Sequence, residues 1–331
     1  MHGHGVPRSF LESVARARTS GVEVEFDRHD GGCTVTFAGH RALRPMPRRM
    51  LDFQKRLEWL DEQGMRRQIV APWLDVQGQQ LDTARGTAWV RELNDFMAEA
   101  VADSGGRLVG HATLYMGDPG AAARELERCH GDLGMHGCMI PAHPPGADIA
   151  DRGYDVLWGA AESMGVPVVL HPVTDGPATQ APSMADFAGL YARLIDTTTA
   201  ATRLILAGVL DRFPALRLVL VHGGGLLPYQ TGRLDREQEG RPNRWGMNVP
   251  LSEYVRRCYF DTVLMSGPAI RLLLDLVGRD HVVIGSDYPF SVGAPPLTES
   301  VNQATGDLET RAAVVHANAV RLFGGGAAGT W

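Results

Sequence analysis

The sequence contains few cysteines, and their spacing is irregular. The only four cysteines among 331 residues are Cys33, Cys129, Cys138 and Cys258. Secreted proteins that depend on disulfide bridges carry cysteines at regular, paired spacings. We therefore expect four reduced cysteines in a cytoplasmic protein.

Long apolar stretches and clusters of positive charge are also missing. No segment approaches the roughly 20 consecutive apolar residues that a membrane-spanning helix needs. The N-terminal residues MHGHGVPRSF are too polar for a signal peptide. Acidic and basic side chains are interspersed, and the net charge is −6. These absences argue against a membrane protein and against a nucleic-acid partner.

What remains is the composition of an ordinary globular protein. Apolar residues make up 44% of the chain and charged residues 21%, which is enough for a large hydrophobic core. The sequence has no internal repeat and no long linker. We expect residues 1–331 to form one domain, with only the glycine-rich tail, residues 323–331, frayed.

Short apolar runs alternate with helical patterns from about Gly64 onward. The expected strands are residues 67–72, 108–115, 137–141, 167–171, 216–222, 259–263 and 282–286. The helical stretches between them include residues 89–101, 121–133, 155–164 and 270–277. This alternation is typical of βα units around a parallel sheet. The pattern predicts an α/β fold, a (β/α)8 TIM barrel.

A barrel of eight strands needs one more strand, and the only place left is before residue 5. Because only Met1 precedes His2, we expect that first strand to be incomplete. An insertion at about residues 15–50 is expected between the first and second barrel strands. In it, residues 22–26 and 33–37 alternate in polarity around Asp30-Gly31-Gly32 and predict a β-hairpin. Residues 48–63 predict one helix, and we expect the insertion to pack over the barrel mouth.

Polar side chains stand where the predicted strands end. His2 and His4 are two residues apart, so in an extended segment both imidazoles point to one side, as two ligands of a zinc-like cation would. A tag remnant or a solvated terminus is the alternative. His171, His222 and Asp287 each follow an apolar run, and in a TIM barrel such strand ends meet at the active-site rim. Histidines satisfied by backbone groups are the alternative there.

The three glycines after His222 permit a sharp turn with close backbone approach. A phosphate-binding loop is the alternative, although no lysine, serine or threonine follows at the needed spacing. His111 lies in a predicted strand and is a candidate to point into the barrel, and Trp73 follows a strand and could line the pocket.

Four motifs occur in a characteristic order along the chain. They are His-x-His, a strand-end His-Pro, HGGGLLPYQTGRLD (222–235) and VVIGSDYPF (282–290). Together they are similar to the metal-dependent, amidohydrolase-related decarboxylases, over nearly the whole chain. The resemblance implies non-oxidative decarboxylation of a small aromatic or conjugated carboxylic acid. Hydrolysis or hydration, as in lactonase-like relatives, is the alternative, and a third hypothesis is a metal-free barrel that serves as a binding subunit.

The resemblance also implies roles for individual residues. His2, His4, His171 and Asp287 match ligands of a divalent metal ion, and His222 matches a catalytic histidine beside it. Either Asp287 or metal-activated water with His222 would deliver the proton, and the sequence leaves both open. The His-x-His start favours zinc, with manganese second.

Two arginines match groups that bind a substrate carboxylate. Arg233 matches an arginine that reaches the active site of a neighbouring subunit, which implies a homodimer. A surface ion pair with Asp235 or Glu237 is the alternative for this side chain. The second arginine matches Arg44, with Arg41 as its alternative.

Overall fold

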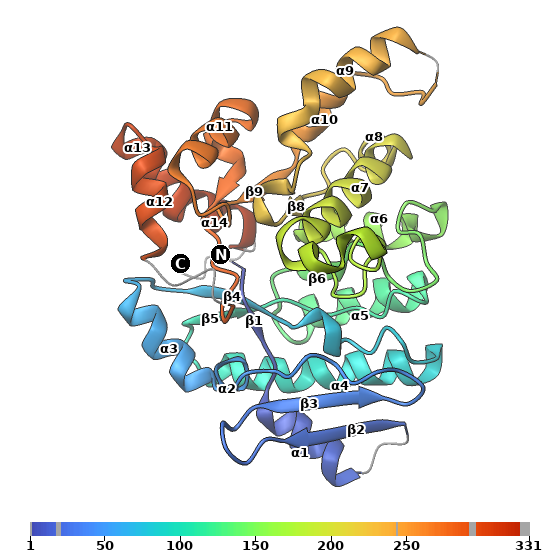
Figure 1. Cartoon of the computed structure of the whole chain (residues 1–331), viewed down its shortest axis with the longest axis vertical. Coiled ribbons are helices and arrows are strands. Elements are labelled where there is room, and N and C mark those ends of the chain that lie inside the picture. Colours follow the sequence, from blue (N-terminus) through green and yellow to red (C-terminus); the bar gives the residue numbers. More distant parts are fainter. Residues whose placement is uncertain (1, 18–20, 243, 291–295, 325–331) are drawn as a thin grey trace. The chain divides into compact units, whose positions relative to one another are not determined.

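The structure is a computed structural model, and it describes residues 2–17, 21–242, 244–290 and 296–324. Most of the predicted frayed tail, residues 325–331, lies outside the described part. The described residues divide into two compact units. The N-terminal unit comprises residues 2–138 and 287–290, and the C-terminal unit comprises residues 139–286 and 296–324 (Figure 1).

A parallel sheet of three short strands forms in the N-terminal unit. Its strands, in spatial order, are β1 (His4–Gly5), β4 (Gln68–Pro72) and β5 (Leu108–Gly110). Both pairs are parallel, with His4 opposite Ala71 and Gln68 opposite Leu108. The helices of this unit are α1 (Arg8–Ala17), α2 (Arg48–Leu51), α3 (Phe53–Glu62), η1 (Leu74–Val76), α4 (Thr83–Ala102) and α5 (Pro119–Gly131). The strand expected before residue 5 therefore forms.

The segment predicted as an insertion contains an antiparallel strand pair. β2 (Val22–Phe26) and β3 (Cys33–Phe37) pair over their whole lengths, with Val24 opposite Val35. Their bounds are those expected from the alternating polarity. Whether this segment is an insertion over a barrel mouth stays a prediction.

The single helix predicted for residues 48–63 is wrong, because the chain breaks at Asp52. Asp52 has extended backbone angles, φ −103° and ψ 94°. Its carboxylate accepts a hydrogen bond from the Lys55 backbone N–H at 3.0 Å and so caps a new helix, α3. The apolar spacing of Met50, Phe53 and Leu60 continues through the break, which is why periodicity alone missed it.

The C-terminal unit contains a sheet of five strands. In spatial order these are β10 (Val282–Val283), β9 (Tyr259–Asp261), β8 (Leu218–Leu220), β7 (Val168–His171) and β6 (Cys138–Pro141). The pairs β7–β8, β8–β9 and β9–β10 are parallel. The α-helices are α6 (Asp155–Met164), α7 (Arg193–Leu206), α8 (Val209–Arg212), α9 (Thr231–Gly240), α10 (Leu251–Arg257), α11 (Gly267–Val277), α12 (Leu297–Ala304), α13 (Leu308–Ala312) and α14 (Asn318–Phe323).

Local signals start and stop these helices. The carboxylates of Asp82 and Asp118 accept backbone N–H groups in the first turns of α4 and α5, at 3.0 and 2.8 Å. Gly165 ends α6 in a left-handed conformation, φ 63°, which glycine adopts without a steric penalty. α6 therefore has the predicted bounds, whereas α4 begins at Thr83, six residues before the predicted stretch.

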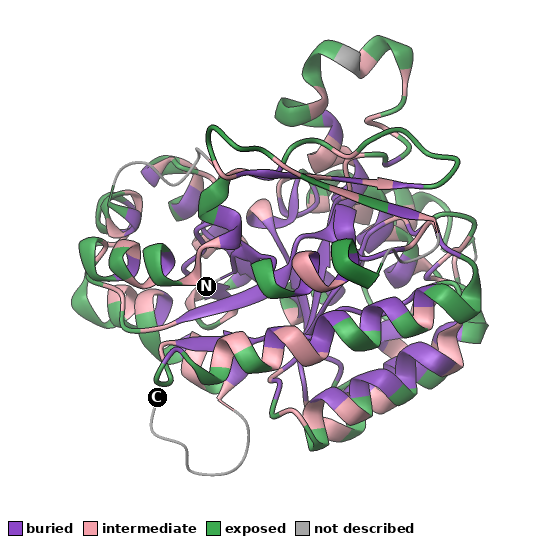
Figure 2. Ribbon diagram, turned by 90° about the horizontal axis from the view of Figure 1, so that it is seen from below, coloured by how far each residue is buried: buried purple, intermediate pink, exposed green. Residues whose placement is uncertain are grey.

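Burial follows the strands in both units. β4, β6 and β7 consist entirely of buried residues, as expected for parallel strands covered on both faces. Figure 2 shows helices that carry buried residues on one face and exposed residues on another. Parallel strands joined by helices confirm the predicted α/β class, while closure of eight strands into one barrel stays a prediction. Among the described helices, none is long and apolar enough to cross a lipid bilayer.

Candidate metal centre

The start of the chain carries two imidazoles that converge on one carboxylate. His2 and His4 flank Gly3, and their ring centroids lie 5.7 Å apart. Nε2 of His4 lies 3.1 Å from Oδ1 of Asp287, and Nε2 of His2 lies 3.5 Å from the same oxygen. Both imidazoles are buried, and the Asp287 side chain is 14% exposed. Three of the predicted ligands therefore meet within the N-terminal unit.

Backbone pairing brings Asp287 to the histidines. The Asp287 N–H donates to the His2 carbonyl at 3.2 Å, and the His4 N–H donates to the Tyr288 carbonyl at 2.6 Å. Gly3 and Tyr288 form a parallel bridge. Asp287 itself has a positive φ of 53°, uncommon for a residue other than glycine. Residues 287 and 288 thus pair with the backbone of residues 2–4, and the Asp287 carboxylate lies beside both imidazoles.

The C-terminal unit brings the other two predicted histidines together. His171 ends β7, His222 follows β8, and their ring centroids lie 5.1 Å apart. Nδ1 of His171 lies 2.7 Å from the Pro172 carbonyl oxygen, so the N–H at that position donates to it. The donor nitrogen leaves the lone pair of the imidazole on Nε2, the arrangement usual for a metal-binding histidine.

The turn after His222 depends on its glycines, as the sequence predicts. His222 has a φ of 56°, and Gly223 and Gly224 have φ values of 62° and 76°. A Cβ on Gly223 would lie 2.6 Å from a methyl carbon of Leu264, so the Leu264 side chain or the turn would have to move to admit one. The Gly223 N–H donates to Oδ1 of Asp261 at 3.1 Å. The buried Asp261 carboxylate therefore holds the turn that orients His222.

Asp261 is a buried carboxylate that was not among the site residues predicted from the sequence. It stands at the end of β9, in the same kind of position as His171 and Asp287, and is 2% exposed. Oδ1 of Asp261 also accepts the Val263 N–H at 3.1 Å. Burial, reinforced by the charge of Asp261, raises the pKa of Tyr229 to about 12. A polar residue directly after the apolar run of β9 was the signal that could have found it.

The predicted substrate arginine Arg44 lies against aromatic rings of the N-terminal unit. Its guanidinium carbon is 5.1 Å from the centroid of Trp73 and 4.8 Å from that of Phe290. The Phe290 ring is in turn 5.6 Å from the His4 ring. These contacts place Arg44, which is exposed, one aromatic ring away from the predicted ligand His4. Trp73 is buried and holds Arg44 by a cation–π contact.

Arg233 lies on the first turn of α9, and its side chain is exposed. The intrachain alternative for this residue does not form among the described residues. Asp235 accepts the Ser252 N–H at 2.9 Å, and Glu237 pairs with Arg241 at 3.7 Å. α9 buries none of its residues within the chain and packs beside α10 (Figure 1).

His111, a candidate to point into the barrel, is a buried and neutral imidazole. It lies after β5 and is fully buried, and burial lowers the pKa of His111 to about 3, so it is neutral at physiological pH.

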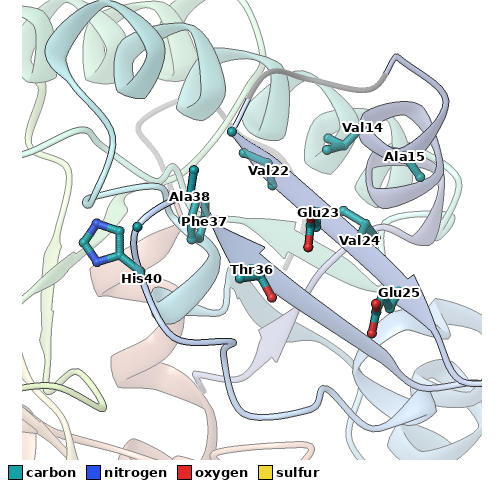
Figure 3. A pocket seen from close by; sticks show the side chains of 12 residues that line it. Val14, Ala15, Val22, Glu23, Val24, Glu25, Thr36, Phe37, Ala38 and His40 are labelled. Carbon is teal, nitrogen blue, oxygen red and sulfur yellow. The ribbon is translucent and has the colours of Figure 1, made fainter.

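A cavity of about 760 Å³ lies between α1 and the β2–β3 pair (Figure 3). Val22, Phe37 and His40 line it, and none of the predicted site residues does.

Comparison with known protein families accounts for most of the chain. A family model described as Amidohydrolase matches residues 45–325. A gamma-resorcylate decarboxylase from Polaromonas sp. (strain JS666) is 32% identical over 268 residues, which are 73% of this chain and 78% of that protein. A 2-amino-3-carboxymuconate-6-semialdehyde decarboxylase from Dictyostelium discoideum is 29% identical over 205 residues, which are 61% of this chain but only 56% of that protein.

Solved structures extend the similarity to the whole fold. The 5-carboxyvanillate decarboxylase of Sphingomonas paucimobilis superposes with a TM-score of 0.81 at 26% identity, covering 98% of each chain. A dihydroxybenzoic acid decarboxylase from Polaromonas sp. JS666, solved with bound manganese and the inhibitor 2-nitroresorcinol, has a TM-score of 0.80 at 25% identity. That match covers 97% of this chain and 95% of the other.

Proposed function

The chain belongs to the amidohydrolase family, and on that premise we propose that it is a metal-dependent decarboxylase of a small aromatic carboxylic acid. The predicted family and reaction class are confirmed by the decarboxylases among its relatives, over the hydrolase alternative. The observation that carries the proposal for this chain is the convergence of His2 and His4 on Asp287.

The donor groups fit a divalent cation. The N-terminal unit offers two imidazole nitrogens and a carboxylate oxygen, and the C-terminal unit offers Nε2 of His171. We propose that these four residues bind one ion together, as the resemblance implies. Three histidines and one carboxylate suit zinc or manganese. The bound manganese of the Polaromonas structure supports manganese, and the His-x-His start supports zinc.

The chain's own residues supply the steps of the reaction. Loss of CO₂ from an aromatic acid requires that the carbon that held the carboxylate receives a proton. A bound divalent ion stabilises negative charge that develops on a substrate oxygen. We propose that His222 moves the proton at neutral pH, with its imidazole aimed by the glycine turn and by Asp261. Asp287 is the alternative proton donor.

Arginines would hold the substrate carboxylate. Arg44, held against both Trp73 and Phe290, lies near His4 and can bind a carboxylate by paired hydrogen bonds. Arg233 projects from a helix with no buried residue, so we propose that it serves the site of a second subunit in a homodimer.

The four cysteines are unpaired and buried, which supports the proposed cytoplasmic location.

Two measurements on the purified chain test this function. Metal analysis should find zinc or manganese bound, and added metal should restore activity after chelation. A panel of hydroxybenzoates and muconate-type acids should contain a substrate from which CO₂ is released without hydrolysis. Turnover of lactones or esters with no CO₂ from any acid would favour the hydrolase alternative. A chain that binds neither ion and acts on no compound would support the binding-subunit hypothesis.

A further inference from the structure

A fully buried arginine lies directly behind β1. The Arg56 side chain, on α3, is 0% exposed. Among the residues that the structure describes, no carboxylate pairs with it, and its Nε has no hydrogen-bond partner. Burying an unpaired guanidinium is costly, and charged side chains are almost never fully buried without a partner. The groups that this guanidinium contacts should therefore indicate its role.

The guanidinium touches both segments that carry the ligands of the N-terminal unit. Its Nη2 donates to the carbonyl oxygen of His4. Its carbon lies 4.6 Å from the ring centroid of Tyr288, the residue after Asp287. Its Nη1 donates to Oε1 of Gln68 on β4 at 2.8 Å. One planar cation therefore connects β1, the Asp287 segment and the neighbouring strand.

On the side that faces Arg56, the start of the chain carries no side chains. Side chains alternate along a strand, so the imidazoles of His2 and His4 face one side and residues 3 and 5 face the other. Both of these residues are glycine. A Cβ on Gly3 would lie 2.4 Å from Nε2 of Gln68 and 3.3 Å from Nη1 of Arg56, and a Cβ on Gly5 would lie 3.0 Å from Cζ of Phe53 and 3.1 Å from Nη2 of Arg56. The absence of side chains lets the guanidinium reach the strand backbone.

A substrate-binding role does not fit Arg56. Its side chain is enclosed by Phe53, Tyr288 and the β1 backbone, whereas a group that binds a substrate carboxylate must be reachable. A purely structural role would be met as well by an apolar residue of similar volume, since such a replacement of a buried charge is often neutral or stabilising. Its contacts with the His4 carbonyl and with the Tyr288 ring instead connect it to the two segments that set the spacing of the ligands.

We propose that Arg56 is a positioning residue for the metal centre. It holds His4 and the Asp287–Tyr288 segment at a fixed spacing. The side chains of His2, His4 and Asp287 are therefore preorganised for the ion. This inference rests on the proposed metal-dependent function. Residues that orient ligands without touching the metal typically contribute about 10–100-fold to metal affinity.

The test compares Arg56→Met with Arg128→Met as a matched control. Arg128 is an arginine of the same unit that pairs with Glu125 and Asp95, both at 2.7 Å, and touches no predicted ligand. Dissociation constants for Zn²⁺ and Mn²⁺ are measured by competition with a chelator. We expect about a 10–100-fold weaker affinity in Arg56→Met, a smaller loss in Arg56→Lys, and an unchanged affinity in Arg128→Met.

Hydrogen exchange of the metal-free protein gives a second readout. The His4 N–H, bonded to the Tyr288 carbonyl, should exchange faster in Arg56→Met than in the wild type or in Arg128→Met. If Arg56→Met does not fold, Gly5→Ala replaces it and keeps the arginine. The added methyl would lie 3.1 Å from Nη2 of Arg56, as well as 3.0 Å from Phe53 and 3.1 Å from Val70. A folded Arg56→Met or Gly5→Ala variant with wild-type affinity and exchange would overturn the inference. A wild-type chain that binds neither ion would instead overturn the proposed function.

Discussion

Substitution of Gly223 by alanine tests the structural basis of the proposed catalytic turn. Gly223 follows His222, has a φ of 62°, and donates its N–H to Asp261. The alanine methyl would lie 2.6 Å from Cδ2 of Leu264, so either Leu264 or the turn must move. The same turn aims His222, which means that a shift large enough to relieve the contact also misplaces the imidazole.

The cost can be worked out from two contributions. A left-handed conformation costs a residue with a Cβ roughly 1–2 kcal/mol. Inserting a methyl group into a packed site costs about 1–3 kcal/mol. The free energy of unfolding of Gly223→Ala should therefore fall by roughly 2–5 kcal/mol, a large share of the 5–15 kcal/mol typical of a domain. Turnover should fall as well, because His222 no longer meets the substrate in its native position.

Urea denaturation and steady-state kinetics measure both effects. Gly131→Ala is the control, since no heavy atom lies within 4 Å of a Cβ at that helical position. It should be neutral or slightly stabilising, by up to about 1 kcal/mol. In the double variant Gly223→Ala/Leu264→Ala, the overpacking part of the loss, about 1–3 kcal/mol, should be recovered relative to the sum of the single variants. A Gly223→Ala chain within about 0.5 kcal/mol of wild type would refute the reasoning.

The remaining predictions concern the proposed ligands, the acid–base residue and the subunit contact. His171→Ala and Asp287→Ala should each abolish activity, because each removes a proposed ligand of the ion; near-normal turnover in either would contradict the assignment. His222→Ala should keep its metal but lose roughly 10²–10⁴-fold in kcat, the usual effect of a positioned acid–base group. Metal content that falls together with its activity would make His222 a ligand. Mixing inactive Arg233→Ala with inactive His171→Ala should restore part of the activity, because a mixed dimer has one intact site. No recovery despite proven subunit exchange would place Arg233 within its own chain.

The secondary structure could be predicted where its causes are local. Strands such as β6 and β8 are short apolar runs, and such a run is all that a parallel strand buried on both faces requires. The break at Asp52 also has a local cause, a side chain that accepts the Lys55 N–H. The helical apolar spacing across the break outweighed that signal in the sequence, so the prediction there was wrong.

Part of the candidate metal centre could also be predicted from local sequence patterns. The alternation of His2 and His4 about a glycine follows from strand geometry, and the turn after His222 follows from three consecutive glycines. Polar residues at strand ends indicated His171 and Asp287. The same rule, applied to the strand that ends at Asp261, would have found that residue too.

By itself, then, the sequence determined which segments are strands, which residues stand at their ends, and which side of β1 carries imidazoles. Only the tertiary structure decided what those residues meet. His4 and Asp287 are 283 positions apart, and their contact depends on the pairing of Tyr288 with β1. In the sequence, Arg56 is a charged residue of an amphipathic helix with nothing to distinguish it. In the structure its side chain is buried and donates to the His4 carbonyl. Strand pairing and burial join segments that are distant in the chain, and the register that joins them is set by packing rather than by local pattern.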